Sequence, residues 1–575
     1  MIGALLRRAR QVAGDPTLRR WLVGRALGRH RGEPAFTAHR PPYLEGLLPL
    51  AAETPRHAFP EIAAAPPTAP IALPLPGLTV ALVPGEAGAL FERTFDDTEV
   101  LLAVHRFAWL PLLGEQADPA WVAALWQAWR QQYGRPGAGW AWHPYTAAER
   151  AINLLDFARR HGLPAPAEDT AAVLAAHAPA IAERLEYFGD HHTSNHLANN
   201  GRGLFRLGLD LGLPKATEIG GRILVEEAKR IFSPSGVLRE GSSHYHLLLT
   251  RNFADAWLAA RAHSRPEADA LQRTAARALA VVPRLMLPGG MPLVGDISPD
   301  CPPEFLSGLS PGGAVEQGWS GLLSSSDRAA LAALLDSTTP VACDALAADG
   351  WRRFDAGPWA GLWHVSPKGW SFMPGHGHQD IGAAELHVGG QPVFIDPGRG
   401  AYGESGEAGL YRSALVHSTL TVNGQDPYPI NRPYYDDDFR RAAGGPPPAL
   451  EIDGTAVLLN HQGFARLNGV GIVTRRWRFQ GNSLAIADRV DGDGFCHLSR
   501  ALATTLDVVI DGGTAQLTGD GLKLVLKADV PLRSEPITRW HAYGTGGPAT
   551  LIVADKVVRM PWSGTIAVEI AGGVS

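Results

Sequence analysis

The sequence predicts a multidomain α+β protein in which a helical N-terminal half is followed by antiparallel β-sheets. Its 575 residues are too many for one hydrophobic core. Residues 100–335 show helical apolar periodicity with capping residues at its ends. After residue 350 the chain consists of short alternating runs broken by Gly, Pro, Asn and Asp, which is typical of strands. We place the boundary between the two patterns near residue 345.

The composition is that of a globular protein, with 45% hydrophobic residues, 19% charged residues and a formal net charge of −5. Its three cysteines, Cys301, Cys343 and Cys496, are scattered and form no CxxC motif, so we expect neither a disulfide framework nor a cysteine metal site. No run approaches the ~20 apolar residues of a membrane span, and no signal-peptide core is visible. The cytoplasm is therefore the default compartment, with the periplasm left open, and we expect no nucleic-acid partner.

Residues 1–60 form a separate basic N-terminal segment in this prediction. The first 40 residues contain nine arginines and only two acids, Asp15 and Glu33. Apolar residues, among them Leu6, Trp21 and Leu22, alternate with the arginines at roughly helical spacing. Such a helix can lie on an anionic membrane surface or contact an acidic protein. The alternative is a helix that packs on its own helical domain.

Helix signals run through the helical region. Asp118 can cap a helix that starts with Pro119 and stops at Gly134. Thr146 and Glu149 have the spacing of a capping box. Amphipathic helices joined by short loops favour stacked pairs, and a bundle, a solenoid and an α/α toroid all fit this pattern. Further helices are expected over residues 170–188, 195–211, 216–231, 243–261, 268–285 and 327–335.

Two of these helices begin with polar clusters. In HHTSNHLANN, Asn195, His196 and Asn199 share one helix face, because residues three and four positions apart are neighbours. In REGSSHYHLLL, Tyr245 stands between His244 and His246 just after a serine cap. Taken singly, such clusters are more typical of caps or surface groups than of catalysis.

The β region contains a set of residues typical of a metal site. Two runs, residues 384–388 and 391–396, have strand character, and a third covers residues 418–422 before an Asn-Gly hairpin signal. His378 precedes the first strand, Asp396 ends the second and His417 precedes the third, so the three could meet at one end of a sheet. Two imidazoles and a carboxylate are a common zinc set.

His376 lies two residues before His378. In extended backbone, residues i and i+2 point to the same side. His376 can therefore stand beside the metal ion and face a substrate.

The ordered set of motifs resembles the heparinase II/III-like polysaccharide lyases. The likeness is strongest at SNHLANNGRGLF, REGSSHYHLLL, HGHQD, FIDPGRGAY and YRSALVHSTLTVNG, and it covers most of residues 100–480. It implies an incomplete (α/α) toroid over residues 61–345, an antiparallel β-sandwich over residues 346–575 and a substrate cleft between them. It also implies a polysaccharide lyase that cleaves a uronic-acid-containing polysaccharide by β-elimination, with an acidic polysaccharide or oligosaccharide as substrate.

The resemblance implies a role for individual residues as well. The metal it implies is a zinc ion, and the placement of its ligands at three predicted strand ends leads us to expect a mainly structural role. At Asn199, some heparin-active members have a carboxylate, which argues against heparin itself as substrate. The implied catalytic residues are Asn195, His196, Tyr245 and His376, the substrate-binding residues are Asn199, Tyr402 and Arg412, and the metal ligands are His378, Asp396 and His417.

β-Elimination suits these residue types. Removing the proton α to a uronate carboxylate builds a second negative charge, which the Asn195 amide and a His376 donor can stabilise. Tyr245 can protonate the leaving oxygen, and can first act as the base if neighbouring cations lower its pKa of ~10. His196 is the alternative base for the opposite C5 epimer.

Two other functions remain open. An α/α-toroid glycoside hydrolase needs a pair of carboxylates, and the nearest candidates, Glu240 and Asp190, form no convincing pair. A lyase-like protein of a polysaccharide assembly pathway could bind the polymer without cleaving it, which would suit a chain without a signal peptide. The retained Asn, His, Tyr and His set favours an active lyase.

Overall fold

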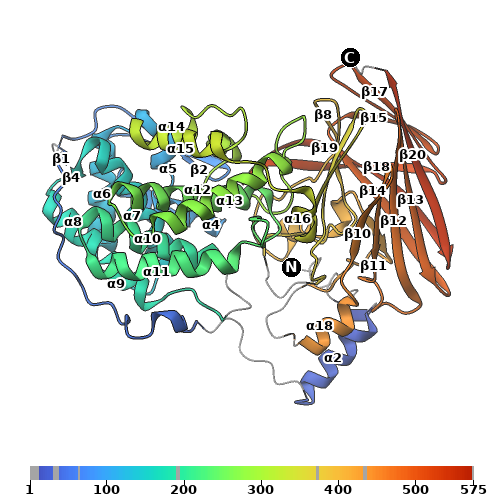
Figure 1. Cartoon of the computed structure of the whole chain (residues 1–575), viewed down its shortest axis with the longest axis horizontal. Coiled ribbons are helices and arrows are strands. Elements are labelled where there is room, and N and C mark those ends of the chain that lie inside the picture. The colour runs from blue at the N-terminus through green and yellow to red at the C-terminus, as the bar shows by residue number, and fades with distance from the viewer. Residues whose placement is uncertain are drawn as a thin grey trace.

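A computed structural model describes residues 9, 12, 13, 15–29, 38–62, 65–189, 195–370, 375–430, 435 and 437–572. Helices gather on one side of the molecule and long strands on the other, as Figure 1 shows. We call residues 38–348 the helical part and residues 351–572 the β part. The helical part ends with α16 (Cys343–Ala348), and the β part begins with β5 (Trp351–Ala356). The predicted order of helices followed by antiparallel sheets is confirmed.

Consecutive helices of the helical part pack on one another, α10 on α11 and α12 on α13, and α7 packs on both α4 and α10. Four short strands and the short helices α3 (Ala89–Glu92), α5 (Trp109–Leu113) and α14 (Gly318–Gly321) complete this part; the strands are β1 (Glu61–Ile62), β2 (Ile71–Leu75), β3 (Leu78–Leu82) and β4 (Leu163–Pro164). The longer helices are α4 (Thr98–Arg106), α6 (Pro119–Tyr133), α7 (Pro144–His161), α8 (Ala167–Ala175), α9 (His177–Glu183), α10 (Asn195–Leu211), α11 (Pro214–Ile231), α12 (Ser243–Ala262), α13 (Ala268–Leu285) and α15 (Ser325–Ser337).

Local capping chemistry sets several of these helix ends. Asp118 accepts a hydrogen bond from the Ala120 N–H at the start of α6, and Gly134 ends that helix, as predicted. The predicted capping box is wrong, because α7 already begins at Pro144 and the Glu149 carboxylate lies inside the protein, 3.0 Å from Arg202 Nη1.

The helix expected over residues 170–188 is two shorter helices, α8 and α9. Pro179 lies in the first turn of α9. Since proline has no N–H and its ring clashes with the preceding turn, Pro179 is unfavourable inside a helix but tolerated in its first turn. The chain accordingly bends at Ala176.

Glycines let α10 and α11 approach closely. A β-carbon at Gly220 would clash with the Phe205 backbone nitrogen, and one at Gly208 would clash with the backbone of Thr217. The close contact of these two helices fixes the start of α10, where Asn195 lies.

The β part contains three antiparallel sheets. Two four-stranded sheets, of order β5-β6-β7-β8 and β18-β19-β14-β9, share one hydrophobic core with an eight-stranded sheet of order β10-β11-β12-β13-β20-β17-β16-β15. Trp363, Trp477, Leu502 and Val568 meet in this core, so the sheets form a sandwich. The remaining strands are β6 (Trp359–His364), β7 (Glu385–Val388), β8 (Gln391–Phe394), β9 (Leu420–Val422), β10 (Ala449–Asp453), β11 (Ala456–His461), β12 (Val470–Gln480), β13 (Ser483–Gly492), β14 (Phe495–Thr504), β15 (Asp507–Asp511), β16 (Thr514–Gly519), β17 (Leu522–Ala528), β18 (Leu532–Ala542), β19 (Thr545–Arg559) and β20 (Trp562–Gly572).

Two expectations about strand pairing are wrong. The strands near the predicted metal ligands do not share one sheet, since β7 and β8 belong to the first four-stranded sheet and β9 to the second. They are neighbours nevertheless, because the Ile395 N–H donates to the Ala503 carbonyl of β14. The Asn423-Gly424 turn, with φ of 54° and 65°, does not join β9 to a hairpin partner; β9 pairs with β14 instead.

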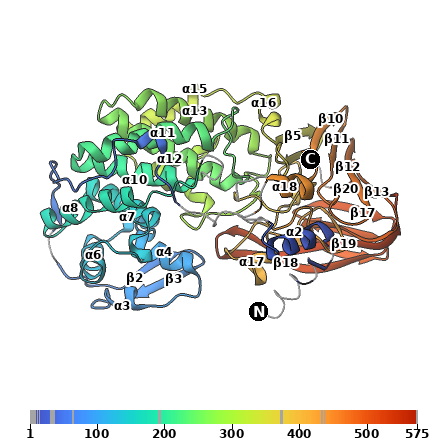
Figure 2. The same cartoon turned by 90° about the horizontal axis from the view of Figure 1, so that it is seen from below.

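The basic N-terminal helix packs on the β part. Helix α2 (Pro16–Ala26) lies beside α18 (Asp437–Gly444) in both views (Figures 1 and 2). The Trp21 ring lies 4.9 Å from Tyr435 and 5.3 Å from Phe439, and Arg466 Nε donates to the buried Asp15 carboxylate at 2.8 Å. The expectation that an internally packed helix would join the helical domain is therefore wrong, while Leu6 lies outside the described residues.

The predicted N-terminal segment also ends too late in the chain. The His39 N–H donates to the Tyr187 carbonyl and the Arg56 N–H to the Leu211 carbonyl, so residues 38–60 belong to the helical part. Arginines 19, 20, 25 and 29 of the α2 region are exposed, and the expected contact with an anionic surface remains a prediction. Of the helices that the structure describes, none is both long and apolar enough to cross a membrane.

We expect Trp21→Ala to weaken the docking of α2, because the substitution removes a buried indole between Tyr435 and Phe439. Truncating a buried tryptophan costs about 3 kcal/mol. Calorimetry should show a lower melting temperature for the β part. Leu27→Ala is the matched control, since Leu27 is 62% exposed on the same segment; equal melting temperatures for the two variants would contradict the observed packing.

Candidate active site and metal centre

Three of the predicted catalytic residues meet where the helical and β parts join. Asn195 is the first residue of α10, Tyr245 lies in the first turn of α12, and His376 lies in the loop before β7. Asn195 Nδ2 is 3.2 Å from His376 Nε2. The Tyr245 ring stacks on the His376 imidazole with centroids 3.5 Å apart and planes inclined by 9°.

Backbone contacts hold the His376 loop against the helical part. The His376 N–H donates to the Glu240 carbonyl at 2.6 Å, and the Asp296 N–H donates to the His376 carbonyl at 2.8 Å. Gly295 has a φ of +78°, and a β-carbon there would lie 2.7 Å from the His376 carbonyl oxygen. Only glycine allows this approach without a clash.

Two buried carboxylates organise these side chains. Glu240 accepts from the Asn195 backbone N–H at 2.7 Å and from its amide at 2.8 Å. Asp296 accepts from Arg399 Nη1 at 3.0 Å and lies 3.1 Å from His376 Nδ1 and 3.0 Å from His378 Nε2. Burial alone would raise the pKa of Asp296, but hydrogen bonds from the two imidazoles and the Arg399 charge hold it well below its ordinary value.

The role of these two carboxylates is not predicted from the sequence. Glu240 appears there only as a candidate hydrolase acid, although its place before Gly241-Ser242 at the start of α12 is a usable signal. Asp296 lies in a loop without periodicity, and its partners are 80 to 103 residues away.

His196, the fourth predicted catalytic residue, pairs with a carboxylate of its own. Its Nδ1 is 2.7 Å from Glu186 Oε1, and its ring centroid is 4.8 Å from that of Tyr145. Burial lowers the pKa of His196, but the Glu186 charge and hydrogen bond outweigh this effect, so the pKa is raised. No pattern in the sequence indicates Glu186, which lies between α9 and α10 outside any motif.

Tyr245 is buried and hydrogen-bonded to another phenol. Its hydroxyl lies 2.5 Å from that of Tyr402, and the Tyr402 N–H donates to the Tyr543 hydroxyl at 3.0 Å. Burial, followed by the Asp300 carboxylate, raises the pKa of Tyr245 well above its ordinary value. The condition under which Tyr245 could first act as the base, a pKa lowered by neighbouring cations, is therefore not met.

The other two predicted substrate-binding residues lie in different surroundings. Asn199 is fully buried one turn after Asn195, and both of its amide atoms lack a hydrogen-bond partner among the described residues. It therefore does not reach the open surface. Arg412 is half-buried, and its carbonyl accepts from the N–H of Gln379, the neighbour of His378.

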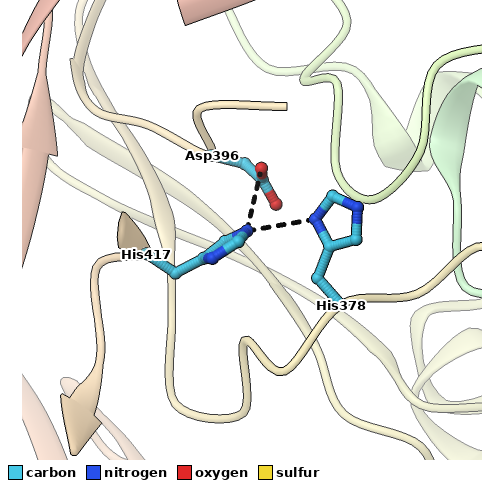
Figure 3. Close-up of side chains that lie close together, drawn as sticks. All are labelled: His378, Asp396 and His417. Carbon is cyan, nitrogen blue, oxygen red and sulfur yellow. Dashed lines mark hydrogen bonds and ion pairs between the residues drawn. The ribbon is translucent and has the colours of Figure 1, made fainter. Parts of the chain in front are cut away.

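The three predicted metal ligands converge. His378 Nδ1 is 3.1 Å from His417 Nε2, which is 3.5 Å from Asp396 Oδ1, and one donor atom of each residue lies within 4.8 Å of the others (Figure 3). The outward nitrogens already face acceptors, since His378 Nε2 faces Asp296 and His417 Nδ1 lies 2.8 Å from the Ser413 carbonyl.

These contacts of the outward nitrogens determine whether the inward nitrogens can bind a cation. If both outward nitrogens donate their N–H groups, two ring lone pairs and one carboxylate oxygen point at a common centre. That donor set suits zinc. In a metal-free chain a proton can take this place, because Asp396 raises the pKa of His417 to about 9 in spite of its burial.

A family model matches most of the β part of the chain. Residues 338–524 match the family described as Heparinase II/III-like, C-terminal. This span contains His376, His378, Asp396 and His417. Comparison with curated proteins gives no significant match.

Solved structures show the same fold over both parts. Heparinase III is 16% identical, with a TM-score of 0.60, and the match covers 84% of this chain and 79% of that protein. A heparan sulfate lyase HepC mutant from Pedobacter heparinus is 17% identical, covers 86% and 80%, and has a TM-score of 0.52. The heparinase III BT4657 gene product is 15% identical, covers 84% and 80%, and has a TM-score of 0.54.

The matched span holds the converging histidines and Asp396, while the structural likeness extends through the helical part that supplies Asn195 and Tyr245. The fold is accordingly an (α/α) toroid followed by an antiparallel β-sandwich. Residues 338–524 therefore resemble the heparinase II/III-like C-terminal family, and the chain as a whole shares the fold of the heparinase III structures.

Proposed function

We propose that the protein is a polysaccharide lyase that cleaves a uronic-acid-containing polysaccharide by β-elimination. The observation that carries this proposal is the contact of Asn195 and Tyr245 from the toroid with His376 from the sandwich. A β-elimination needs a stabiliser for the uronate carboxylate, a base and an acid. These side chains, with His196, are of the required types.

The Asn195 amide and His376 would stabilise the charge that develops on the uronate. One amide N–H of Asn195 is held by Glu240, and the amide also faces His376 Nε2, so the two polar groups lie side by side. Because both are fixed by carboxylates and backbone contacts before substrate arrives, little reorganisation is needed during the reaction.

We assign the proton transfers to two different residues. His196, with its pKa raised by Glu186, would take the C5 proton, and the electron pair would form the C4–C5 double bond as the C4–O bond breaks. Tyr245, with its pKa raised by burial, keeps its proton and would give it to the leaving oxygen. Groups whose surroundings drive their pKa values apart are suited to separate acid and base roles.

We further propose that His378, Asp396 and His417 hold one zinc ion with a mainly structural role. When bound, zinc would supply a fixed positive charge that ties three separate segments together. Asp296 faces both His378 and His376, so the orientation of His376 depends on the same carboxylate as the ligand His378.

The rival functions have weaker support. A hydrolase acid at Glu240 is unfavourable, because this carboxylate is buried and accepts two hydrogen bonds from Asn195. Asp190 lies outside the described residues. A protein that binds without cleaving would not need the stacked pair of Tyr245 and His376.

A screen on uronate polymers tests the function. Purified protein would be incubated with heparan sulfate, chondroitin sulfate, hyaluronan and alginate. We expect products with the ultraviolet absorbance of an unsaturated uronate. New reducing ends without this absorbance would indicate hydrolysis, and binding without products would indicate a non-catalytic protein.

Tyr245→Phe should lower turnover by about two to four decades, because it removes the proton donor and keeps the ring that stacks on His376. Initial rates measured by ultraviolet absorbance check this expectation. Tyr543→Phe is the matched control, as it removes the hydroxyl that accepts from the Tyr402 backbone N–H and keeps the ring that packs edge-on against the Tyr402 ring. Near-normal turnover of Tyr245→Phe would exclude its role as acid.

Asp396→Ala should lose the metal and lower the melting temperature, since it removes one of three converging ligands. His376→Ala should lower turnover and keep the metal, because His376 faces Asn195 and Asp296 instead of the metal centre. Elemental analysis and calorimetry of the two purified variants check both expectations. Equal metal loss in both variants would identify His376 as a ligand. A wild-type protein that contains no metal and melts at the same temperature as Asp396→Ala would rule out the site.

Glu186→Gln should move the rising, acidic limb of the kcat/KM profile to lower pH. A base must be deprotonated, and removing the Glu186 charge lowers the pKa of His196, while Glu240 and Arg106 continue to act on it in opposite directions. The pH dependence of kcat/KM, measured for wild type and variant, checks the shift. An acidic limb at the same pH would assign the base to another residue.

A further inference from the structure

One tryptophan of the toroid is exposed beside the catalytic residues. Trp140 begins the 3₁₀ helix η3 (Trp140–Trp142) and is 51% exposed, whereas Trp121, Trp126 and Trp129 of the same part are fully buried. Its ring centroid lies 5.6 Å from that of His143. A large aromatic side chain left in solvent at a polar site is typical of a binding surface.

A short series of contacts connects Trp140 with His196. His143 Nε2 lies 3.6 Å from Glu186 Oε1, and the same oxygen lies 2.7 Å from His196 Nδ1. Only the His143 imidazole therefore separates the tryptophan from the Glu186–His196 pair.

The exposed fractions of the side chains show on which side the candidate site faces solvent. Tyr245 is buried and the His376 side chain is 17% exposed, whereas His143 is 31% and His196 is 43% exposed. The open end of the site thus includes His196, His143 and Trp140. A polymer that places one uronate at His376 would continue over this open side.

The same surface carries positive charge. Arg184 donates to the Trp142 carbonyl, which fixes it next to η3, and its charge acts on His143. Among the residues that the structure describes, no carboxylate forms an ion pair with Arg184. Arg106, in contrast, is neutralised by Asp300 and Glu99. Arg184 is therefore the cation of this surface that an anionic ligand could pair with.

We propose that Trp140, His143 and Arg184 form a subsite for an anionic sugar unit that neighbours the unit being cleaved. The apolar face of the sugar ring would lie on the indole, and its carboxylate or sulfate would face Arg184 and His143. This inference rests on the proposed function, because it extends the same site. It adds a determinant of chain length and charge next to the residues that would perform the chemistry.

The subsite should act on long chains more than on short ones. Its contacts are with a sugar that does not react, so they contribute to binding of the polymer and only indirectly to the chemical step. Trp140→Ala should lower kcat/KM about tenfold on dodecasaccharides, mainly through KM, which corresponds to about 1.4 kcal/mol. On the shortest cleaved oligosaccharide it should have little effect.

The experiment uses size-defined oligosaccharides of heparan sulfate, chondroitin sulfate, hyaluronan and alginate with the full-length protein. Cleavage is followed by ultraviolet absorbance and binding by calorimetry, for wild type, Trp140→Ala, Trp140→Phe and Arg184→Gln. We expect the phenylalanine variant to recover part of the affinity and the glutamine variant to weaken the salt dependence of binding. Phe495→Ala is the control, because Phe495 is a 73% exposed aromatic residue on β14.

The outcomes separate this inference from the proposed function. Cleavage with unchanged chain-length dependence in Trp140→Ala would overturn the subsite alone. Binding that Trp140→Ala weakens, without cleavage by the wild type, would support the subsite and overturn the lyase. No binding of any of the four glycans to the wild type would overturn both.

Discussion

The active-site region depends on one buried carboxylate, that of Asp296. It belongs to the toroid, yet the side chains around its two oxygens, His376, His378 and Arg399, all come from the sandwich. Removing one of these partners would leave a buried charge uncompensated, which costs several kcal/mol, so the assembled junction requires all of them. The contact between Asn195 and His376 exists only while the junction is closed, because the two residues come from opposite sides of it.

The same carboxylate connects two parts of the site that would otherwise be independent. His378 converges with Asp396 and His417, while His376 contacts Asn195 and Tyr245. Asp296 faces both imidazoles. A change in the position of the His378 ring would therefore move the Asp296 carboxylate, which is the partner of His376 Nδ1. A cation held by the three ligands would therefore influence the reaction without touching a substrate, in the way that outer partners of metal ligands commonly do.

The sequence predicts those parts of this arrangement that are encoded by residues close together in the chain. Helix caps such as Asp118 and the cluster around Tyr245 are encoded within a few residues, and the HGH, Asp and His motifs anticipated the convergence of His378, Asp396 and His417. Strand pairing is not local, and the expected single sheet became two because β9 pairs with β14, about 80 residues later. Asp296 and the docking of Trp21 escaped prediction because each depends on a partner far away in the sequence, and Glu186 escaped because its partner ten residues later belongs to no periodic pattern.

The surroundings of the two proton-transfer candidates differ in a way that favours separate roles. Tyr245 lies at the buried end, against Tyr402 and near Asp300, where ionisation of a phenol is costly. His196 lies at the open end, where Glu186 stabilises its protonated form. A residue that holds its proton is suited to protonate a leaving oxygen, and a residue whose protonated form is stabilised is the stronger base. In the proposed mechanism the acid therefore lies at the buried end of the site and the base at its exposed end, so that a sugar chain would pass His196 before it reaches Tyr245.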